Sequence, residues 1–168
     1  GFEEKIILTN IIPDEDNEPD VIDIVYKIEN KKLENEIYHD REAAYVVLID
    51  QDKIAVVKTA SGKLFLPGGK IEAGESLEEC VIRECLEEMG AKIEVKQYFA
   101  IGERYFYHEA SCRFSHVIGH FFYSDTYEIV GESTEKDETL LWLSYDEAIE
   151  RFYHPHHKWA VECIWNGR

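Results

Sequence analysis

The strongest constraint on the fold is a helix whose two ends are both specified by the sequence. Pro67-Gly68-Gly69 ends the apolar segment before it, because proline and adjacent glycines interrupt strands. Ser76, followed three residues later by Glu79, is the capping-box pattern that begins a helix, and Gly90 is a typical left-handed stop. These signals predict a glycine-rich turn and then a helix over Leu77–Met89.

The predicted helix carries three glutamates on one face. Glu84, Glu87 and Glu88 are three and four residues apart, so they lie within roughly 100° of one another around the helix axis. A divalent cation would relieve the repulsion among three such carboxylates, and ligation by oxygen alone favours Mg²⁺ or Mn²⁺ over Zn²⁺. For three glutamates taken alone, a solvated acidic face is the alternative. The apolar residues expected to anchor this helix in the core are Ile82, Cys85, Leu86 and Met89.

A longer pattern connects the glycine turn to the glutamates. Gly69, five residues, Glu75, seven residues, and then Arg-Glu, Glu-Glu and Gly90 match the motif G-x5-E-x7-R-E-U-x-E-E-x-G-U. On this motif the chain resembles the Nudix superfamily, and within it the small bacterial MutT-type proteins. Cys85 and Ala91 stand where the family usually carries larger aliphatic residues, which concerns packing rather than chemistry. Weaker similarity extends over residues 41–165.

The resemblance implies an α+β fold, a Nudix-type α/β/α sandwich with a mixed β-sheet. It also implies Mg-dependent hydrolysis (Mn²⁺ being the other candidate cofactor) of a pyrophosphate bond in a nucleoside triphosphate or other nucleoside diphosphate derivative. A dinucleoside polyphosphate hydrolase remains an alternative. A non-catalytic, nucleotide-sensing Nudix module is a second one, although such modules commonly lose the motif carboxylates that are present here.

Residue roles follow from position in the motif. The resemblance gives metal ligation to Glu87 and Glu88, and either ligation or activation of the attacking water to Glu84, so these three form the catalytic set. Gly68 is expected to contribute a backbone carbonyl to the metal.

Other residues receive supporting roles. Arg83 and Glu75 are expected to form an ion pair that holds the loop against the helix. Lys70 is a candidate phosphate contact, with a solvated lysine as the alternative. Tyr107 is a candidate for stacking on the substrate, although Tyr105-Phe106-Tyr107 also reads as a strand with rings on alternate faces. The family often adds one carboxylate from a late loop, and the candidates are Glu135, Asp137 and Glu138.

The rest of the chain reads mainly as strands. Periodicity predicts strands over 5–12, 21–28, 43–49, 54–59, 64–66, 93–100, 103–107, 113–123 and 139–143. Further helices are predicted to begin at Ser144 and to cover 159–165. Residues 13–20 are an acidic turn, and Pro19 occupies the place where a calcium loop of the EF-hand type needs glycine. We therefore expect a β-rich extension over 1–38 and the Nudix hydrolase domain over 39–168.

Charge narrows the choice of partners. The chain has 35 acidic and 18 basic residues, for a net charge of −17. Such a surface repels polyanions, so we expect a small-molecule nucleotide substrate, no nucleic acid polymer and no membrane partner. No apolar run approaches the roughly 20 residues of a membrane span, and no signal-peptide pattern is visible, so a cytoplasmic protein is expected. A homodimer is left open.

Cysteines and histidines receive structural interpretations. The four cysteines show no metal-binding or redox spacing and are interpreted as buried free thiols in a reducing compartment. The histidine cluster near the carboxyl end is interpreted as a surface or helix-start feature rather than a metal site. Its members are His154, His156 and His157.

Overall fold

The computed structural model describes residues 2–10, 20–30 and 32–167 of the chain. Its strands are β1 (Phe2–Asn10), β2 (Asp20–Glu29), β3 (His39–Asp50), β4 (Lys53–Lys58), β5 (Leu64–Phe65), β6 (Gly68–Lys70), β7 (Ala91–Glu94), β8 (Gln97–His108), β9 (Arg113–Ser124), β10 (Thr126–Ile129) and β11 (Thr139–Ser144). Its helices are α1 (Leu77–Met89), α2 (Tyr145–Ile149) and α3 (Pro155–Asn166).

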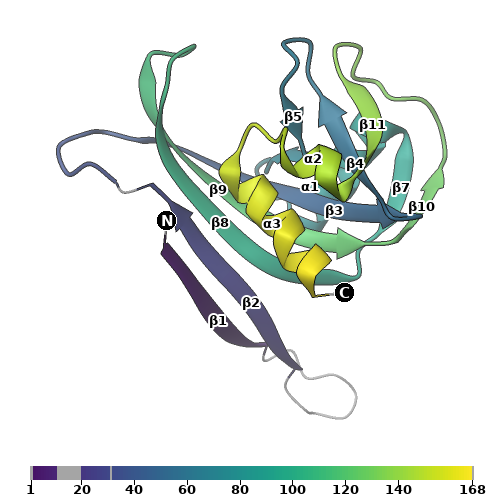
Figure 1. Ribbon diagram of the computed structural model, residues 1–168, viewed down its shortest axis with the longest axis horizontal. Coiled ribbons are helices and arrows are strands. Elements are labelled where there is room, and N and C mark those ends of the chain that lie inside the picture. Colours follow the sequence, from purple (N-terminus) through teal and green to yellow (C-terminus); the bar gives the residue numbers. More distant parts are fainter. Residues whose placement is uncertain (1, 11–19, 31, 168) are drawn as a thin grey trace.

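In the described part of the chain, most strands join one mixed sheet between helices (Figure 1). The strand order is β1-β2-β8-β9-β3-β4-β11, with β5 paired to β4 and β6 paired to β3. β3 runs parallel to β9 and antiparallel to β4, and β10 and β7 form a separate two-stranded sheet. Because α1 covers one face and α3 the other, the α+β sandwich with a mixed sheet is confirmed.

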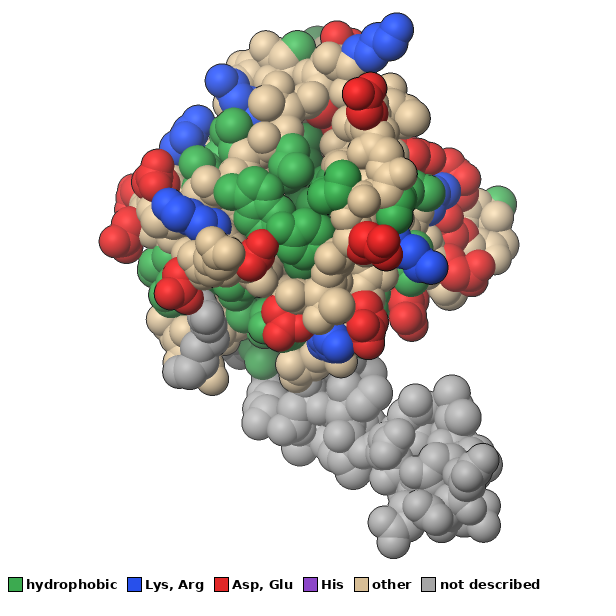
Figure 2. Space-filling view, turned by 90° about the vertical axis from the view of Figure 1, so that its right-hand side faces the viewer, with side chains coloured by type: hydrophobic (Ala, Val, Ile, Leu, Met, Phe, Trp, Pro, Cys, Tyr) green, Lys and Arg blue, Asp and Glu red, His purple; other side chains and the backbone are tan. Residues whose placement is uncertain are grey.

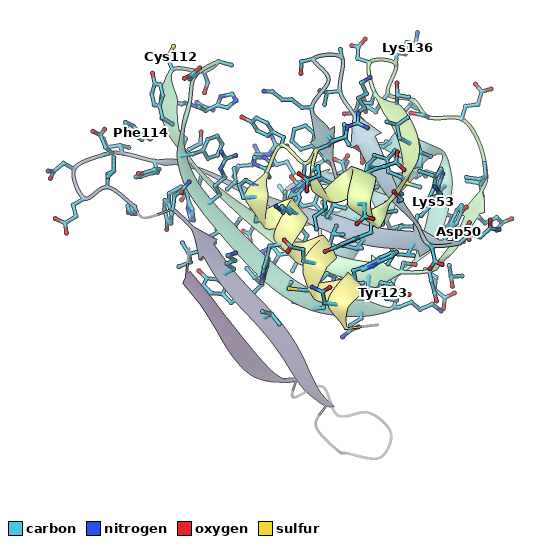
Figure 3. All side chains as sticks on the ribbon, in the orientation of Figure 1. Asp50, Lys53, Cys112, Phe114, Tyr123 and Lys136 are labelled. Atoms are coloured by element: carbon cyan, nitrogen blue, oxygen red, sulfur yellow. The ribbon has the colours of Figure 1, made fainter. Side chains whose placement is uncertain are left out.

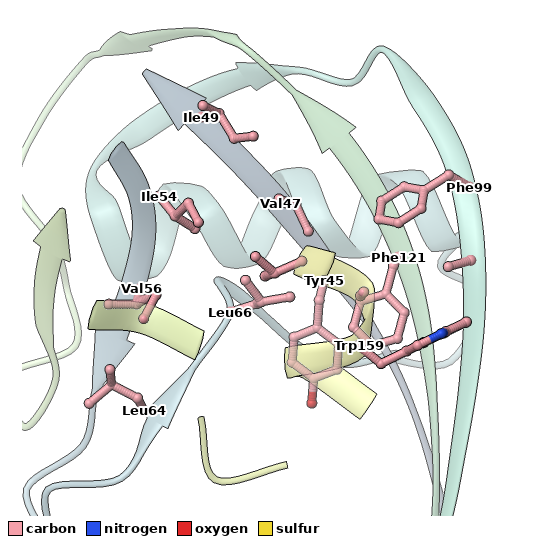
Figure 4. Close-up of a cluster of buried hydrophobic side chains, with 14 of the residues drawn as sticks. Tyr45, Val47, Ile49, Ile54, Val56, Leu64, Leu66, Phe99, Phe121 and Trp159 are labelled. Carbon is pink, nitrogen blue, oxygen red and sulfur yellow. The ribbon is translucent and has the colours of Figure 1, made fainter. Parts of the chain in front are cut away.

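The central strand β3 supplies both hydrophobic cores. Its alternate residues Ala44, Val46 and Leu48 pack on the α1 side. Tyr45, Val47 and Ile49 face the opposite side, where Tyr45, Phe121 and Trp159 come together (Figure 4). A strand covered on both faces is buried nearly continuously, which explains its apolar run.

Helix α1 begins and ends where the local signals predict. Ser76 Oγ accepts a hydrogen bond from the Glu79 backbone N–H at 3.1 Å, and Glu79 Oε1 accepts one from the Ser76 N–H at 3.2 Å. Gly90 closes the helix with φ of 63°. The helix over Leu77–Met89 is therefore confirmed.

The expected burial of α1 was wrong at one position. Leu86 is half exposed, whereas Glu88 is buried. The buried stripe of the helix instead runs through Val81, Cys85 and Glu88, at spacings of four and three residues. Rotation of the helix toward this stripe brings a carboxylate, rather than a leucine, against the sheet.

Several strand boundaries also differ from expectation. The segments predicted at 93–100 and 103–107 are instead β7 and one long β8, because β7 pairs with β10 in its own small sheet. Neither β10 nor β6 was predicted. The hairpin between β3 and β4 is confirmed, and Gln51 and Asp52 at its turn both have positive φ, as a type I′ turn requires. The last helix is longer than predicted and begins at Pro155.

The amino-terminal hairpin extends the same sheet. β1 and β2 pair antiparallel, and β2 then pairs parallel with β8, with Val25 opposite Ala100. The predicted strands are present, with β1 displaced toward the amino end. The acidic turn predicted at 13–20 falls almost entirely on residues outside the described part of the chain.

The molecular surface reflects the charge balance. Figure 2 shows a face on which acidic side chains gather around a hydrophobic area, with fewer basic side chains. No helix in the described ranges is both long and apolar enough to span a membrane.

One interpretation of the histidines near the start of α3 placed them on the surface, and it was wrong. His154, His156 and His157 are all buried, and His157 Nδ1 accepts a hydrogen bond from the Leu66 N–H at 3.2 Å. The helix-start interpretation holds, because His154 is the N-cap residue of α3. Burial lowers the pKa of His154 to about 2 and that of His156 to about 3, so both rings are neutral at physiological pH.

The four cysteines are free thiols, as expected, but they are not all buried. Cys80 and Cys85 belong to the core on the α1 side. Cys112 is exposed at the turn between β8 and β9, so the interpretation of a buried thiol was wrong for this residue.

Candidate active site

The glycine loop lies directly against α1. Gly68 has φ of +145°, and a Cβ there would stand 2.1 Å from the Ala44 carbonyl oxygen, so only glycine fits. At Gly69, a Cβ would stand 2.6 Å from Glu84 Oε1. The pair therefore lets the backbone approach the glutamates of α1 more closely than any side chain would allow.

Arg83 joins the loop to the helix. Its Nε donates to Glu75 Oε2 at 2.6 Å and its Nη2 donates to Glu75 Oε1 at 3.0 Å, so the predicted ion pair is present in bidentate form. The hydrogen bonds from Arg83 lower the pKa of Glu75 to about 2. Arg83 Nη2 also donates to the Lys70 carbonyl oxygen at 3.2 Å. The guanidinium thus holds the loop in place.

The same guanidinium faces two glutamates of the motif. Arg83 Nη1 lies 3.0 Å from Glu84 Oε1 and 3.3 Å from Glu87 Oε2. Glu84 is largely shielded from solvent, and burial raises its pKa despite the hydrogen bond from Arg83. The side chain of Glu87 is 38% exposed, so this carboxylate is the most accessible of the three.

Glu88 is a carboxyl group held inside the protein. Its residue is 7% exposed, and Gly68 donates its backbone N–H to Oε1 at 2.8 Å. Burial raises the pKa of Glu88 to about 10, with the Gly68 N–H opposing this shift and Glu138 adding to it. Two carboxyl groups that share a desolvated space disfavour the ionised form of each other.

Glu138, just before β11, completes the acidic group. It is half-buried, and its Oε2 is a buried oxygen without a hydrogen-bond partner among the described residues. A buried, unpaired carboxylate oxygen is costly unless a cation or donor reaches it. Of the three late-loop candidates, only Glu138 lines the pocket that Glu88 lines; Glu135 and Asp137 are exposed.

Two of these acidic side chains, Glu88 and Glu138, line a pocket of about 380 Å³. Gly68 and Gly69 line the same pocket. The β8–β9 hairpin, with Cys112 at its tip, and the loop with Lys136 rise on opposite sides of the molecule (Figure 3). The pocket lining includes Phe106 and His108 of β8 and Arg113 of β9. Tyr45 also lines the pocket, and burial raises its pKa to about 12, so its phenol stays protonated.

The carboxylates are close neighbours but do not form a closed cage. No three His, Cys, Asp or Glu side chains in the described ranges are arranged to enclose a metal ion. Glu88 and Glu138 face the pocket, Glu84 lies against Gly69, and Glu87 lies against Arg83. Their donors are oxygens only, the set that suits Mg²⁺ or Mn²⁺.

Two predicted substrate contacts lie elsewhere. Tyr107 is half exposed, stands 5.2 Å from the Phe114 ring, and does not line the pocket. Its neighbour Phe106 does line it, because successive residues of a strand face opposite sides. Lys70 is exposed and also lies outside the pocket lining.

Sequence reasoning missed the aromatic and basic side chains that line the same pocket. They are Arg41, Lys63, Phe65, Phe106, Arg113 and Tyr153. These residues come from segments as far apart as β3 and the loop before α3. The one available signal was the period of two along β8, which places Phe106 and His108 on the same face.

Comparisons with known proteins agree with this architecture. The solution structure of the Escherichia coli ORF135 protein has a TM-score of 0.58 at 23% identity, covering 77% of this chain and 91% of that one. A mutator MutT protein from Bacillus halodurans has a TM-score of 0.57 at 26% identity, covering 74% of this chain and 81% of the other.

The sequence comparisons concern the same region. "Putative nudix hydrolase 1" of Caenorhabditis elegans is 39% identical over 56 residues, which are 33% of this chain and 14% of that protein. The chain therefore spans only a small part of that relative. The family model of the NUDIX domain matches residues 39–163, most of the chain. The chain belongs to the Nudix hydrolase family.

Proposed function

We propose that this protein hydrolyses a pyrophosphate bond in a nucleoside triphosphate or other nucleoside diphosphate derivative, with Mg²⁺ or Mn²⁺ as its cofactor. The observation that carries the proposal is the burial of Glu88 beside the glycine loop, in the lining of a pocket that Glu138 also lines. Burying two neighbouring carboxyl groups costs stability, and groups with such perturbed pKa values are concentrated at functional sites.

The residues fit a divalent cation. Glu138 Oε2 has no hydrogen-bond partner in the described structure, and burial disfavours the ionised forms of Glu84 and Glu88. Nudix hydrolases generally use a divalent metal, which neutralises phosphate oxygens and the leaving group when bound. In this chain Glu84, Glu87, Glu88 and Glu138 are the proposed ligands, with the Gly68 carbonyl as a further one.

The other roles proposed for site residues are to activate the attacking water and to position the carboxylates. Glu84 is the proposed base for the attacking water if it does not bind the metal, because it lies next to the glycine loop. Arg83 keeps Glu84 and Glu87 in place through its Nη1 contacts while Glu75 holds its other edge. These contacts act on position rather than on the phosphate itself.

Two alternatives have less support. The dinucleoside polyphosphate alternative relied on Tyr107, which does not line the pocket. Nucleotide-sensing modules commonly lack motif carboxylates, whereas all three motif glutamates are present on α1.

The test is product identification. The protein is incubated with Mg²⁺ or Mn²⁺ and a panel of canonical and oxidised triphosphates, dinucleoside polyphosphates, ADP-ribose and nucleotide sugars, and the products are followed by ³¹P NMR. We expect a nucleoside monophosphate plus pyrophosphate, or the equivalent pair from a diphosphate derivative, and loss of activity with EDTA. Nucleotide binding without any product would contradict the proposal and favour a sensor.

A further inference from the structure

The glycine loop is held from the α1 face and also from the α3 face of the sheet. On the α1 face, Gly68 donates its N–H to the carboxyl group of Glu88. Two residues earlier, the Leu66 N–H donates to Nδ1 of His157 at 3.2 Å, across 91 positions of the chain. His157 is in the first turn of α3, and both residues of this bond are fully buried. The backbone that leads into the glycine loop is therefore fixed by a side chain of α3.

A backbone contact precedes this hydrogen bond. The segment before α3 runs beside β5 in a parallel β-bridge, in which the Tyr153 N–H donates to the Leu64 carbonyl oxygen at 3.0 Å. Backbone groups that point the same way recur every second residue of an extended chain, so the next group toward α3 is the Leu66 N–H. The partner segment has turned into a helix at this point, and the imidazole of His157 is the acceptor in place of a backbone carbonyl.

The hydrogen bond determines which nitrogen of His157 carries the proton. Burial lowers the pKa of His157 well below its usual value, so the ring is neutral. Because Nδ1 accepts from Leu66, the proton is on Nε2. Nε2 is buried and has no hydrogen-bond partner among the described residues, which costs stability. An apolar side chain would remove this cost, but it would leave the Leu66 N–H without its acceptor.

Aromatic rings fix the orientation of the imidazole. The His157 centroid lies 4.2 Å from that of Tyr45 and 5.6 Å from that of Phe121. Tyr45 and Phe121 belong to the same core cluster as Leu66 (Figure 4). An imidazole packed in this way cannot turn Nδ1 aside without disturbing the core, so it is a fixed acceptor.

The chain between Leu66 and Gly68 has little freedom. Pro67 fixes its own φ and restricts the backbone of Leu66. The Pro67 carbonyl belongs to the same planar peptide unit as the Gly68 N–H, and its oxygen accepts a hydrogen bond from the Val46 N–H at 2.9 Å. Because this unit is planar and its neighbour is restricted, a displacement of Leu66 moves the Gly68 N–H relative to α1.

We propose that His157 is a positioning residue for the reaction: its Nδ1 fixes the Leu66 N–H and thereby keeps the Gly68 backbone in place against α1. His157 does not line the pocket, so it acts through the glycine loop and not by contact with a ligand. This inference rests on the proposed function for the chemistry. It adds a residue of α3 to those that shape the site.

Metal affinity and turnover give the first test. His157→Leu keeps a buried apolar side chain but removes the acceptor. It is expected to weaken Mn²⁺ binding, measured by isothermal titration without nucleotide, by about 10-fold or more. With the nucleotide that the wild-type protein cleaves fastest, kcat should fall by about 10-fold, whereas KM should change little because no substrate contact is removed.

A conservative variant should rescue the effect. In His157→Asn, Oδ1 of asparagine stands about where Nδ1 of histidine stands, and it can accept the same hydrogen bond. This variant should restore most of the Mn²⁺ affinity that His157→Leu loses. Both variants should lower the thermal midpoint, because the buried side-chain amide of asparagine also lacks partners. Metal affinity and stability are therefore expected to separate.

Val161→Ala is the matched control for lost stability. Val161 lies four residues after His157, on the same face of α3, and is fully buried in the core. The variant should lower the thermal midpoint and leave Mn²⁺ binding unchanged.

Hydrogen exchange gives a readout that needs neither metal nor substrate. In EDTA, the Leu66 and Gly68 amides should exchange about 5-fold faster in His157→Leu than in Val161→Ala, because only the first variant removes a hydrogen bond at the loop. His157→Asn should resemble Val161→Ala in this measurement.

The contrary outcomes are equally specific. Equal losses of Mn²⁺ affinity in His157→Leu, His157→Asn and Val161→Ala would overturn the proposal, because affinity would then follow stability alone. Hydrolysis by the wild-type protein, with unchanged kcat and unchanged Gly68 exchange in His157→Leu, would leave the proposed function standing and remove this inference. Faster Gly68 exchange in His157→Leu, with neither Mn²⁺ binding nor hydrolysis by the wild-type protein, would keep the contact between His157 and the loop and remove the proposed function.

Discussion

The backbone N–H of Gly68 donates a 2.8 Å hydrogen bond to Oε1 of Glu88, 20 residues later in the chain. This bond joins the glycine loop to the last turn of α1 and holds a buried carboxyl group in the lining of the pocket. It also offsets part of the cost of burying that group, because the N–H favours its ionised form.

Removing one motif carboxylate should abolish most activity without unfolding the protein. Glu84→Gln or Glu87→Gln is expected to lower turnover by more than about a hundredfold, because each removes a charge that holds metal or water. Steady-state kinetics and circular dichroism are the measurements, and the exposed Glu135→Gln is the control. Near-normal turnover in both variants would remove the catalytic assignment.

Glu88→Gln should make the metal-free protein less sensitive to alkaline pH. The pKa of Glu88 is raised to about 10 in the fold, so the folded state keeps a proton that the unfolded chain releases above about pH 4.5. Stability from this group is therefore present at acid pH and is lost as pH rises toward 10.

Urea unfolding in EDTA at pH 6 and pH 9 tests the effect of Glu88. The wild-type protein should lose more stability over this interval than Glu88→Gln does. If the unfolding free energies of the two proteins changed equally with pH, Glu88 would be ionised and solvated in the folded protein. Added Mg²⁺ should stabilise the wild-type protein more than the variant.

The buried histidines should make the fold sensitive to acid. Burial and Arg104 lower the pKa of His156 to about 3. Between about pH 6.5 and pH 3, His156 is therefore protonated in the unfolded chain but neutral in the folded protein. Stability from the neutral ring is complete above about pH 6.5 and falls as pH decreases toward 3. Each such histidine contributes a slope of up to about 1.4 kcal/mol per pH unit in that range.

Comparison with His156→Gln isolates this contribution of one histidine. Between pH 7.5 and 5.5, the variant should lose about 1 kcal/mol less unfolding free energy than the wild-type protein. Because the acidic residues are common to both proteins, their opposing titration cancels in the difference. An equal loss in both would mean that His156 is protonated in the folded state.

Gly68→Ala should destabilise the fold severely. The new Cβ would stand 2.1 Å from the Ala44 carbonyl oxygen, at a φ that disfavours alanine, and backbone atoms cannot move aside cheaply. A loss above about 3 kcal/mol in unfolding free energy is expected. Gly62→Ala is the control, because Gly62 also has positive φ but nothing within 4 Å of the added Cβ, so it should cost about 1 kcal/mol. Similar losses in both variants would mean that strain alone, not contact with β3, requires Gly68.

The sequence by itself determined α1, its two caps and the clustering of Glu84, Glu87 and Glu88. These features depend on interactions within one or two helical turns, such as the reciprocal bonds between Ser76 and Glu79. The Arg83–Glu75 ion pair also joins residues only eight positions apart. Interactions between residues that are close in sequence can therefore be predicted from residue spacing.

Tertiary structure alone decided which side chains meet in the pocket. Glu138 rather than Glu135 or Asp137 lies beside Glu88, because β11 pairs with β4 and presents its preceding residue there. Burial of the histidines and separation of β7 from β8 likewise follow from pairing across the fold. Contacts between residues from 20 to about 100 positions apart depend on the closing of the whole sheet, and no local spacing encodes them.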